Sequence, residues 1–266
     1  MANNSRWNIL RAFGANRRIR RAKSPQLRRT IRFESLEMRA LLSVQPAGDE
    51  FRVNSFESGS QSLGEPADNF LYGFFPNFST SARSAAFAND GTFIVAWTSE
   101  GQDGDNRGVF AQRFDSLGEL LGVEFQVNST TFGDQAFASV VVAADGTFVI
   151  AWQASQPGSE GLDIYARRFS ASGSPFDAEF RVNTYTTSNQ AFPAIAVNDD
   201  GNFVITWASL GQDGSDGGVY AQRFNSSGAA QGAEFRVNTF THNNQSYPDV
   251  ATAADGSFAI TWSSWD

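Results

Sequence analysis

The segment NFVITWAS at residues 202–209 decides the fold, because it is apolar at nearly every position and recurs along the chain. Its counterparts begin at Thr92, Thr147 and Ser257 and read TFIVAW, TFVIAW and SFAITW. A strand with one face in water alternates apolar and polar residues, whereas a continuous apolar run is typical of a strand buried on both faces. Each copy follows an Asp-Gly pair, which favours a tight hairpin turn. We therefore expect antiparallel sheets with a further sheet packed on either side.

The same segment sets the period of a repeat. Four tryptophans end these copies, each 55 residues after the last: Trp97, Trp152, Trp207 and Trp262. The third unit reads as four short strands bounded by Gly, Asn, Asp and Ser clusters, at 194–197, 202–209, 218–224 and 233–238. Strands of this length and spacing, with no helical period, indicate an all-β repeat protein.

The repeats predict four-stranded antiparallel blades in a β-propeller-like array. A stacked β-sandwich and an open β-solenoid are the alternatives. The fourth unit has only its first two strands before Asp266, so the last blade is expected to be incomplete, with residues 50–54 as a candidate replacement strand. An incomplete blade exposes a strand edge, through which the chain could associate with itself.

Charge divides the chain into two parts. Residues 1–39 hold eleven Lys and Arg and two acids, a net charge of +9, whereas the remainder holds nine basic residues and 26 acids, a net charge of -17. We predict a basic, disordered N-terminal targeting arm over 1–44 and the β-repeat domain over 45–266. The acidic domain argues against nucleic-acid binding, and no apolar run is long enough to predict a membrane span. The absence of cysteine excludes disulfides and thiolate chemistry.

Two segments resemble known bacterial sequences. FESLEMRALLS (33–43) resembles the N-terminal LEPR-XLL motif of large extracellular or envelope proteins of planctomycetes, matching it at Leu36, Glu37, Arg39, Leu41 and Leu42, with Met38 where the motif has proline. The 55-residue unit, EFRVNT followed by DGxFVITW and GVYAQRF, is similar to repeats in large secreted or surface-attached bacterial proteins. Both resemblances imply export to the cell envelope or beyond, and neither implies a particular chemistry.

Residues that recur in every unit are most simply explained by the scaffold. The four tryptophans are therefore expected in the core. Arginines of the third strands are expected to bind carboxylates or carbonyls of a neighbouring blade, with recurring glutamates as candidate partners; they are Arg113, Arg168 and Arg223, and Glu124, Glu179 and Glu234. His242, the single histidine, breaks the repeat but lies in a polar loop, so no catalytic residue and no cofactor is assigned.

Two loop regions are candidate binding sites. Oxygen ligands on glycine-rich loops suit Ca²⁺, so Asp103, Asp105, Asp213 and Asp216 are candidate calcium ligands, with plain solvated loops as the alternative. A 19-residue insertion in the first unit, at about 62–81, is unusually apolar. Either it covers the open face of the first blade or it binds a partner through Phe70, Leu71, Tyr72, Phe74 and Phe75.

These observations favour a non-enzymatic extracellular or cell-surface module for adhesion or structure, binding a protein or polysaccharide partner. One alternative is a propeller-type extracellular hydrolase or lyase acting on polysaccharide. Another is a calcium-stabilised adhesin fragment. An enzyme would need a polar cluster that is confined to one or two units, and the sequence offers none beyond His242 and the insertion.

Overall fold

The computed structural model describes residues 6–12, 52–56, 58–62, 83–156 and 160–265, with the backbone alone for 6–12. By contacts the chain divides into Met1–Phe13 with Val53–Asp266, and Gly14–Arg52. Every regular element in the described ranges is a β-strand, which confirms the all-β prediction. Nowhere in these ranges is there a helix of the length and apolarity needed to cross a membrane.

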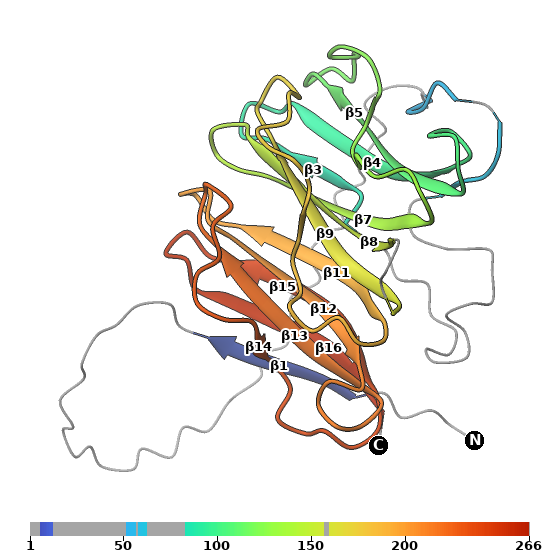
Figure 1. Ribbon diagram of the computed structural model, residues 1–266. Coiled ribbons are helices and arrows are strands. Elements are labelled where there is room, and N and C mark those ends of the chain that lie inside the picture. Colours follow the sequence, from blue (N-terminus) through green and yellow to red (C-terminus); the bar gives the residue numbers. More distant parts are fainter. Residues whose placement is uncertain (1–5, 13–51, 57, 63–82, 157–159, 266) are drawn as a thin grey trace, which may run out of the picture. The chain divides into compact units, whose positions relative to one another are not determined.

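The strands form four consecutive antiparallel sheets, one for each repeat unit (Figure 1). The first unit contains β3 (Ala85–Phe87), β4 (Phe93–Glu100), β5 (Arg107–Phe114) and β6 (Phe125–Gln126). The second contains β7 (Gln135–Val142), β8 (Phe148–Ser155), β9 (Leu162–Phe169) and β10 (Phe180–Arg181). The third contains β11 (Gln190–Val197), β12 (Phe203–Leu210), β13 (Gly217–Phe224) and β14 (Phe235–Arg236), and the fourth β15 (Gln245–Thr252) and β16 (Phe258–Ser264).

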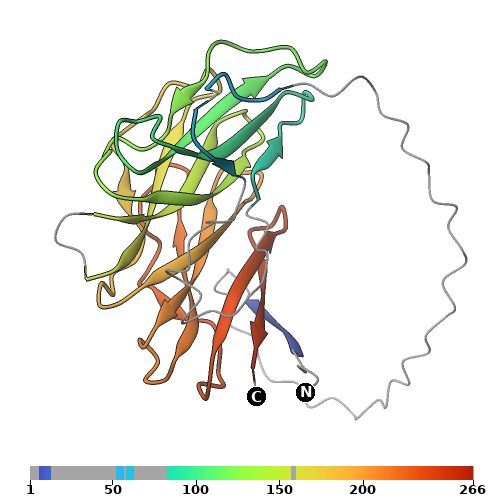
Figure 2. The same cartoon turned by 90° about the vertical axis from the view of Figure 1, so that its right-hand side faces the viewer.

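Each sheet is a simple meander whose first strand is the inner one. The inner strands β3, β7, β11 and β15 contact one another in succession, and the short fourth strands lie at the outer edges. Figure 2 shows the sheets following one another in a fan, from the first unit in green to the fourth in red. This is the predicted β-propeller-like array of four-stranded blades.

The second strand of each unit is buried on both faces, as its composition predicts. In β8, Ile150 and Trp152 pack with the first unit, while Val149 and Ala151 pack with the third. The tryptophans at this position are 4%, 0%, 0% and 7% exposed, in chain order, so their predicted core role is confirmed. Alternate residues of one strand therefore supply two separate cores.

Two of the three recurring arginines, Arg113 and Arg168, join their unit to the next, which confirms the predicted contact with a neighbouring blade at these positions. Arg113 Nη1 donates to the carbonyl oxygen of Ser172 at 2.7 Å, and Arg168 Nη1 contacts that of Ser227 in the same way. Each serine lies in the turn after the third strand of the following unit. A guanidinium bound to a carbonyl supplies a charge-assisted hydrogen bond at the junction.

The recurring glutamates make a second junction, but with backbone amides rather than with these arginines. Glu179 Oε2 accepts from the backbone nitrogen of Ser129, in the preceding unit, at 2.6 Å, and Glu179 Oε1 accepts from Gln156 at 3.2 Å. Glu124 holds the amide of Ser55 and Glu234 that of Thr184 in the same way. Successive units are thus held by one repeated bond at each end of the blades.

A bulge interrupts each complete inner strand at an aromatic residue. Phe137, Phe192 and Tyr247 have positive φ angles of 58°, 57° and 53°, which bulky side chains rarely adopt. The register of each inner strand shifts at this point. The rings pack in sequence, with centroids 5.4 Å and 4.8 Å apart. This row, buried at Phe137 and Phe192 and partly buried at Tyr247, supports the strained backbone.

In the first unit the insertion enters at the same bulge. β2 (Gln61–Ser62) and β3 both pair with β4, and Gln61 faces Ser99 as Gln135 faces Ala154 in the second unit. The two short strands are therefore one inner strand, divided by residues 63–82. Those residues lie outside the described ranges, and the candidate partner-binding side chains from Phe70 to Phe75 lie among them.

The third strand of the fourth sheet comes from the other end of the sequence. β1 (Arg6–Ala12) pairs antiparallel with β16, from Arg6 opposite Ser264 to Ala12 opposite Phe258. This differs from the expected disordered arm, because the edge of β16 offers unpaired backbone groups to any nearby extended segment. Residues 52–56 do not join this sheet; Ser55 binds Glu124 instead.

The first and fourth inner strands are linked by a pair that no other unit repeats. Arg83 Nη2 donates to the carbonyl oxygen of Val250 at 3.2 Å and to Asp249 Oδ1 at 3.3 Å. Both side chains are largely exposed, so the ion pair itself adds little stability. The contact shows that the array curves enough for its first and last described inner strands to meet.

Candidate functional site

The blades have two distinct ends. Because neighbouring strands are antiparallel, the turns after the first and third strands lie at one end, and the loops after the second and fourth strands lie at the other. We call these the turn end and the loop end. Sites at the two ends are built from different parts of each repeat, so they are described separately.

At the loop end, four side chains of the first and second units gather into what we call the loop-end cluster: Asp105, Arg107, Phe132 and Asp134. Arg107 Nε donates to Asp134 Oδ1 at 2.8 Å, and the two side chains are 22% and 36% exposed. Asp105 Oδ2 accepts from the backbone nitrogen of Gly133, also at 2.8 Å. The ring of Phe132 is 64% exposed beside them. Because Asp105 holds the backbone of Gly133, which lies between Phe132 and Asp134 in the chain, the two carboxylates and the exposed ring come from adjacent loops.

The loop-end cluster departs from the repeat at each of its positions. Asp105 corresponds to Glu160 and Ser215, Arg107 to Leu162 and Gly217, Phe132 to Thr187 and His242, and Asp134 to Asn189 and Asn244, so only the first position keeps a carboxylate in a second unit. The sequence analysis missed this cluster because it compared what the units share. An alignment of the units would have revealed Arg107 and Asp134, because these two charged residues replace neutral ones.

The four predicted calcium ligands are not brought together. Asp103 Oδ2 accepts from Asn128 at 3.2 Å and Asp213 Oδ2 from Asn238 at 3.1 Å, so each holds the loop to the fourth strand of its own unit. Asp216 is exposed. Among the described residues, no three or more His, Cys, Asp or Glu side chains are grouped to hold a metal ion. Calcium binding stays a prediction of the sequence.

His242 lies at the loop end, exposed, as its polar surroundings predict. Its ring centroid is 5.9 Å from that of Phe240, and its carbonyl oxygen accepts from Gln245 Nε2 at 2.7 Å. These contacts are those of a loop residue that caps the start of β15.

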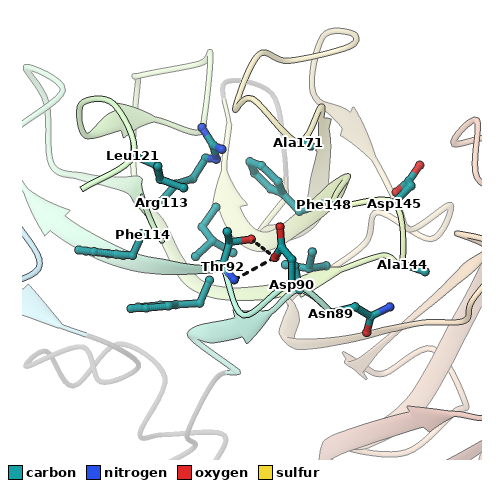
Figure 3. A pocket seen from close by; sticks show the side chains of 15 residues that line it. Asn89, Asp90, Thr92, Arg113, Phe114, Leu121, Ala144, Asp145, Phe148 and Ala171 are labelled. Carbon is teal, nitrogen blue, oxygen red and sulfur yellow. Dashed lines mark hydrogen bonds between the residues drawn. The ribbon is translucent and has the colours of Figure 1, made fainter. Parts of the chain in front are cut away.

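At the turn end, a cavity of about 300 Å³ lies between the first and second units. We call it the turn-end pocket. Its polar side chains are Asn89, Asp90 and Thr92 from one turn, Asp145 from the equivalent turn, and Arg113 from β5. Figure 3 shows Phe114, Phe148, Asp90 and Arg113 among the side chains that surround it.

The two aspartates of the turn-end pocket are fixed by their own turns. Asp90 Oδ1 accepts from the Thr92 hydroxyl at 2.7 Å and from the Thr92 amide at 2.9 Å. Asp145 binds Thr147 in the same way. These bonds, the hydroxyl first, lower the pKa of both carboxyl groups below the ordinary value of 3.8. Both carboxylates are therefore ionised at neutral pH and serve as acceptors rather than as proton donors.

Replacing Thr147 by valine is expected to raise the pKa of Asp145 toward 3.8, because the hydroxyl bond is the largest cause of its lowering. Since the pKa is lower in the folded protein, this carboxylate stabilises the fold above about pH 3.8, and the contribution is lost as the pH falls through the folded value. An NMR titration of the Asp145 carboxyl carbon measures both values. An unchanged pKa in the variant would place the cause outside the turn.

Comparison with known proteins gives a fold and no family. Neither a protein-family profile nor a curated protein sequence matches the chain. A protein of unknown function from Dyadobacter fermentans DSM 18053 has a similar structure, with a TM-score of 0.47 and 12% identity over 67% of this chain and 51% of that one. An endo-arabinase from Bacteroides thetaiotaomicron VPI-5482 gives a TM-score of 0.44 and 16% identity, over 65% and 66% of the two chains. The arabinanase Arb43A of Bacillus subtilis gives 0.42 and 14%, over 64% and 62%.

The expectation of a non-enzymatic surface module is corrected by these matches, because most of the named structures are glycoside hydrolases. They agree better with the alternative, a propeller-type hydrolase. This chain spans about half to two thirds of the length of the first two matches. At such low identity the likeness extends to the fold alone, so an activity has to be argued from the chain's own residues.

Proposed function

We propose that the protein is a hydrolase that cleaves glycosidic bonds of a polysaccharide at the loop end of its blades. The observation that carries the proposal is the loop-end cluster, in which Asp105 and Asp134 come from loops of consecutive units. Asp134 has no carboxylate counterpart in the other units, and no other unit combines both carboxylates with an arginine at the position of Arg107. Glycosidic hydrolysis generally uses two carboxyl groups that flank the bond to be cleaved. The exposed ring of Phe132 beside them offers an apolar surface for the face of a sugar.

The two carboxyl groups are assigned different tasks. Asp134, which accepts from Arg107 Nε at 2.8 Å, is assigned the general base that takes the proton of the attacking water. Asp105, the second carboxyl group of the cluster, is assigned the general acid that gives a proton to the oxygen of the leaving sugar. A bond then forms between the water oxygen and the anomeric carbon, and the glycosidic bond to the leaving oxygen breaks. One water is consumed, and the two carboxyl groups are restored by exchange of protons with solvent.

We further propose that the reaction takes place outside the cell or in its envelope. A polysaccharide substrate, the acidic repeat domain and the LEPR-XLL-like segment at 33–43 support this location. Fractionation of cells that express the full chain, followed by antibody detection, would show in which cellular compartment the protein is found. Recovery in the cytoplasmic fraction alone would contradict the proposal.

The test of the activity is direct. The full chain is incubated with arabinan, xylan and β-glucan, and new reducing ends are counted over time. We include arabinan because several structures of similar fold are named for its hydrolysis. Release of reducing ends from at least one polymer is expected. If none is cleaved between pH 4 and pH 9, the proposal is wrong.

A further inference from the structure

The turn-end pocket is lined by two small side chains at positions where the third unit has larger ones. Ala144 and Ala171 line it, whereas the corresponding residues of the third unit are Asp199 and Ser226. The volume of about 300 Å³ is at the lower end of the range for small-molecule sites, roughly 300 to 1,000 Å³. A ligand of one or two sugar residues fits this size.

A second difference concerns the arginine in the wall of the pocket. In the second unit Arg168 lies over the ring of Phe176, at 5.0 Å from its centroid. The first unit has Leu121 at the position of Phe176, so Arg113 has no ring there. The turn-end pocket therefore places the guanidinium of Arg113 beside an aliphatic side chain. Its bond to the Ser172 carbonyl uses one of its five N–H donors.

The polar groups of the turn-end pocket select the class of ligand. Asp90 and Asp145 are both ionised and outnumber the single guanidinium, so an anionic ligand is disfavoured. Carboxylates accept hydrogen bonds from hydroxyl groups, and Arg113 donates to a ring or hydroxyl oxygen. Apolar surface from Phe93 and Leu121, which are both partly exposed, can cover the C–H face of a sugar. Acceptors, one donor and apolar surface in a small cavity are what a neutral sugar requires.

We propose that the turn-end pocket is an accessory binding site for a neutral sugar residue of the polysaccharide, at the opposite end of the blades from the loop-end cluster. This rests on the proposed function for the identity of the polymer, but the binding itself does not require hydrolysis. The pocket holds the chain to its substrate. It is a binding site, because it lies at the opposite end of the blades from the carboxyl groups assigned to bond cleavage.

The test fills the pocket and leaves the rest of the protein intact. Ala144 is exposed, so Ala144→Trp is expected to fold and to occupy the cavity. Ala254→Trp is the matched control, because Ala254 has the same position in the turn of the fourth unit and is also exposed. Both changes are made in the full chain that also carries Asp134→Asn, so that hydrolysis does not consume the ligand. Arabino-, xylo- and cello-hexaose are titrated by calorimetry.

At least one hexaose is expected to bind Asp134→Asn and Asp134→Asn/Ala254→Trp with equal affinity, and Asp134→Asn/Ala144→Trp about tenfold more weakly. Equal affinity in all three proteins would overturn the site, and so would the absence of binding at about 10 mM hexaose. The activity is tested separately, by cleavage of polymer with the unaltered protein. Binding without cleavage would refute the proposed function alone, and cleavage without binding would refute the pocket alone.

Discussion

Replacing Asp134 by asparagine is expected to lower the rate of polysaccharide hydrolysis by about 100- to 10,000-fold, the usual contribution of a general base. The fold should be unaffected, because asparagine is the native residue at the equivalent positions 189 and 244. In the second unit, Asn189 Oδ1 accepts from the backbone nitrogen of Leu162 at 3.0 Å, which shows that the scaffold accommodates the amide. Initial rates of reducing-end release, with circular dichroism as a check on folding, measure the effect.

The matched control is Asp216→Asn, which removes an exposed aspartate from the corresponding loop of the third unit. It should retain full activity. Asp105→Ser, which restores the third unit's Ser215, should lose activity as Asp134→Asn does. If Asp134→Asn and Asp105→Ser hydrolyse polymer at the unaltered rate, the loop-end cluster is not the site, even where the protein proves to be a hydrolase.

Replacing Trp207 by alanine is expected to destabilise the fold by about 3–5 kcal/mol, the usual cost of removing a buried large aromatic side chain. Trp207 is fully buried and belongs to the core shared by the second and third units. Its indole Nε1 also donates to Gln190 Oε1 at 3.2 Å. A loss of this size is a large share of the stability of an ordinary domain. Urea unfolding monitored by circular dichroism measures it.

A comparison of two phenylalanine variants separates packing from hydrogen bonding. Trp152 is as buried as Trp207, but its Nε1 has no hydrogen-bond partner among the described residues. Trp207→Phe should therefore cost about 1–2 kcal/mol more than Trp152→Phe, because it leaves Gln190 Oε1 without this donor. Equal losses would mean that the indole bond contributes nothing and that packing alone accounts for the burial.

The sequence was most informative where one residue type recurs at a fixed step. The all-β class, the strand order and the buried tryptophans follow from a two-sided apolar strand repeated every 55 residues. The glutamates were assigned the wrong partners, since Glu179 binds a backbone amide of the preceding unit. Nearly every residue has a backbone amide, so no residue pattern identifies the one that is bound. The pairing of β1 with β16 was also out of reach, because RWNILRA does not resemble a third strand of the repeat.

The candidate site was less predictable for a related reason. Repetition directs attention to shared residues, whereas Arg107 and Asp134 have neutral residues at the equivalent positions of the other units. Arg107 and Asp134 are 27 residues apart, and their meeting depends on the path of two loops at one end of the blades. The turn-end pocket depends on small side chains, and the absence of bulk at Ala144 or Ala171 carries no chemical signal of its own.

The inner-strand bulge is also a place where additional sequence can be inserted into the chain. In the first unit the chain leaves after Ser62 and returns by Arg83, yet β2 and β3 keep the register of an unbroken strand against β4. The equivalent bulges at Phe137 and Phe192 already release the chain from regular pairing for two residues. Foreign peptides spliced there would leave the ladders on both sides in place. The inner-strand bulges are therefore sites where a foreign peptide or a small folded domain could be inserted and displayed.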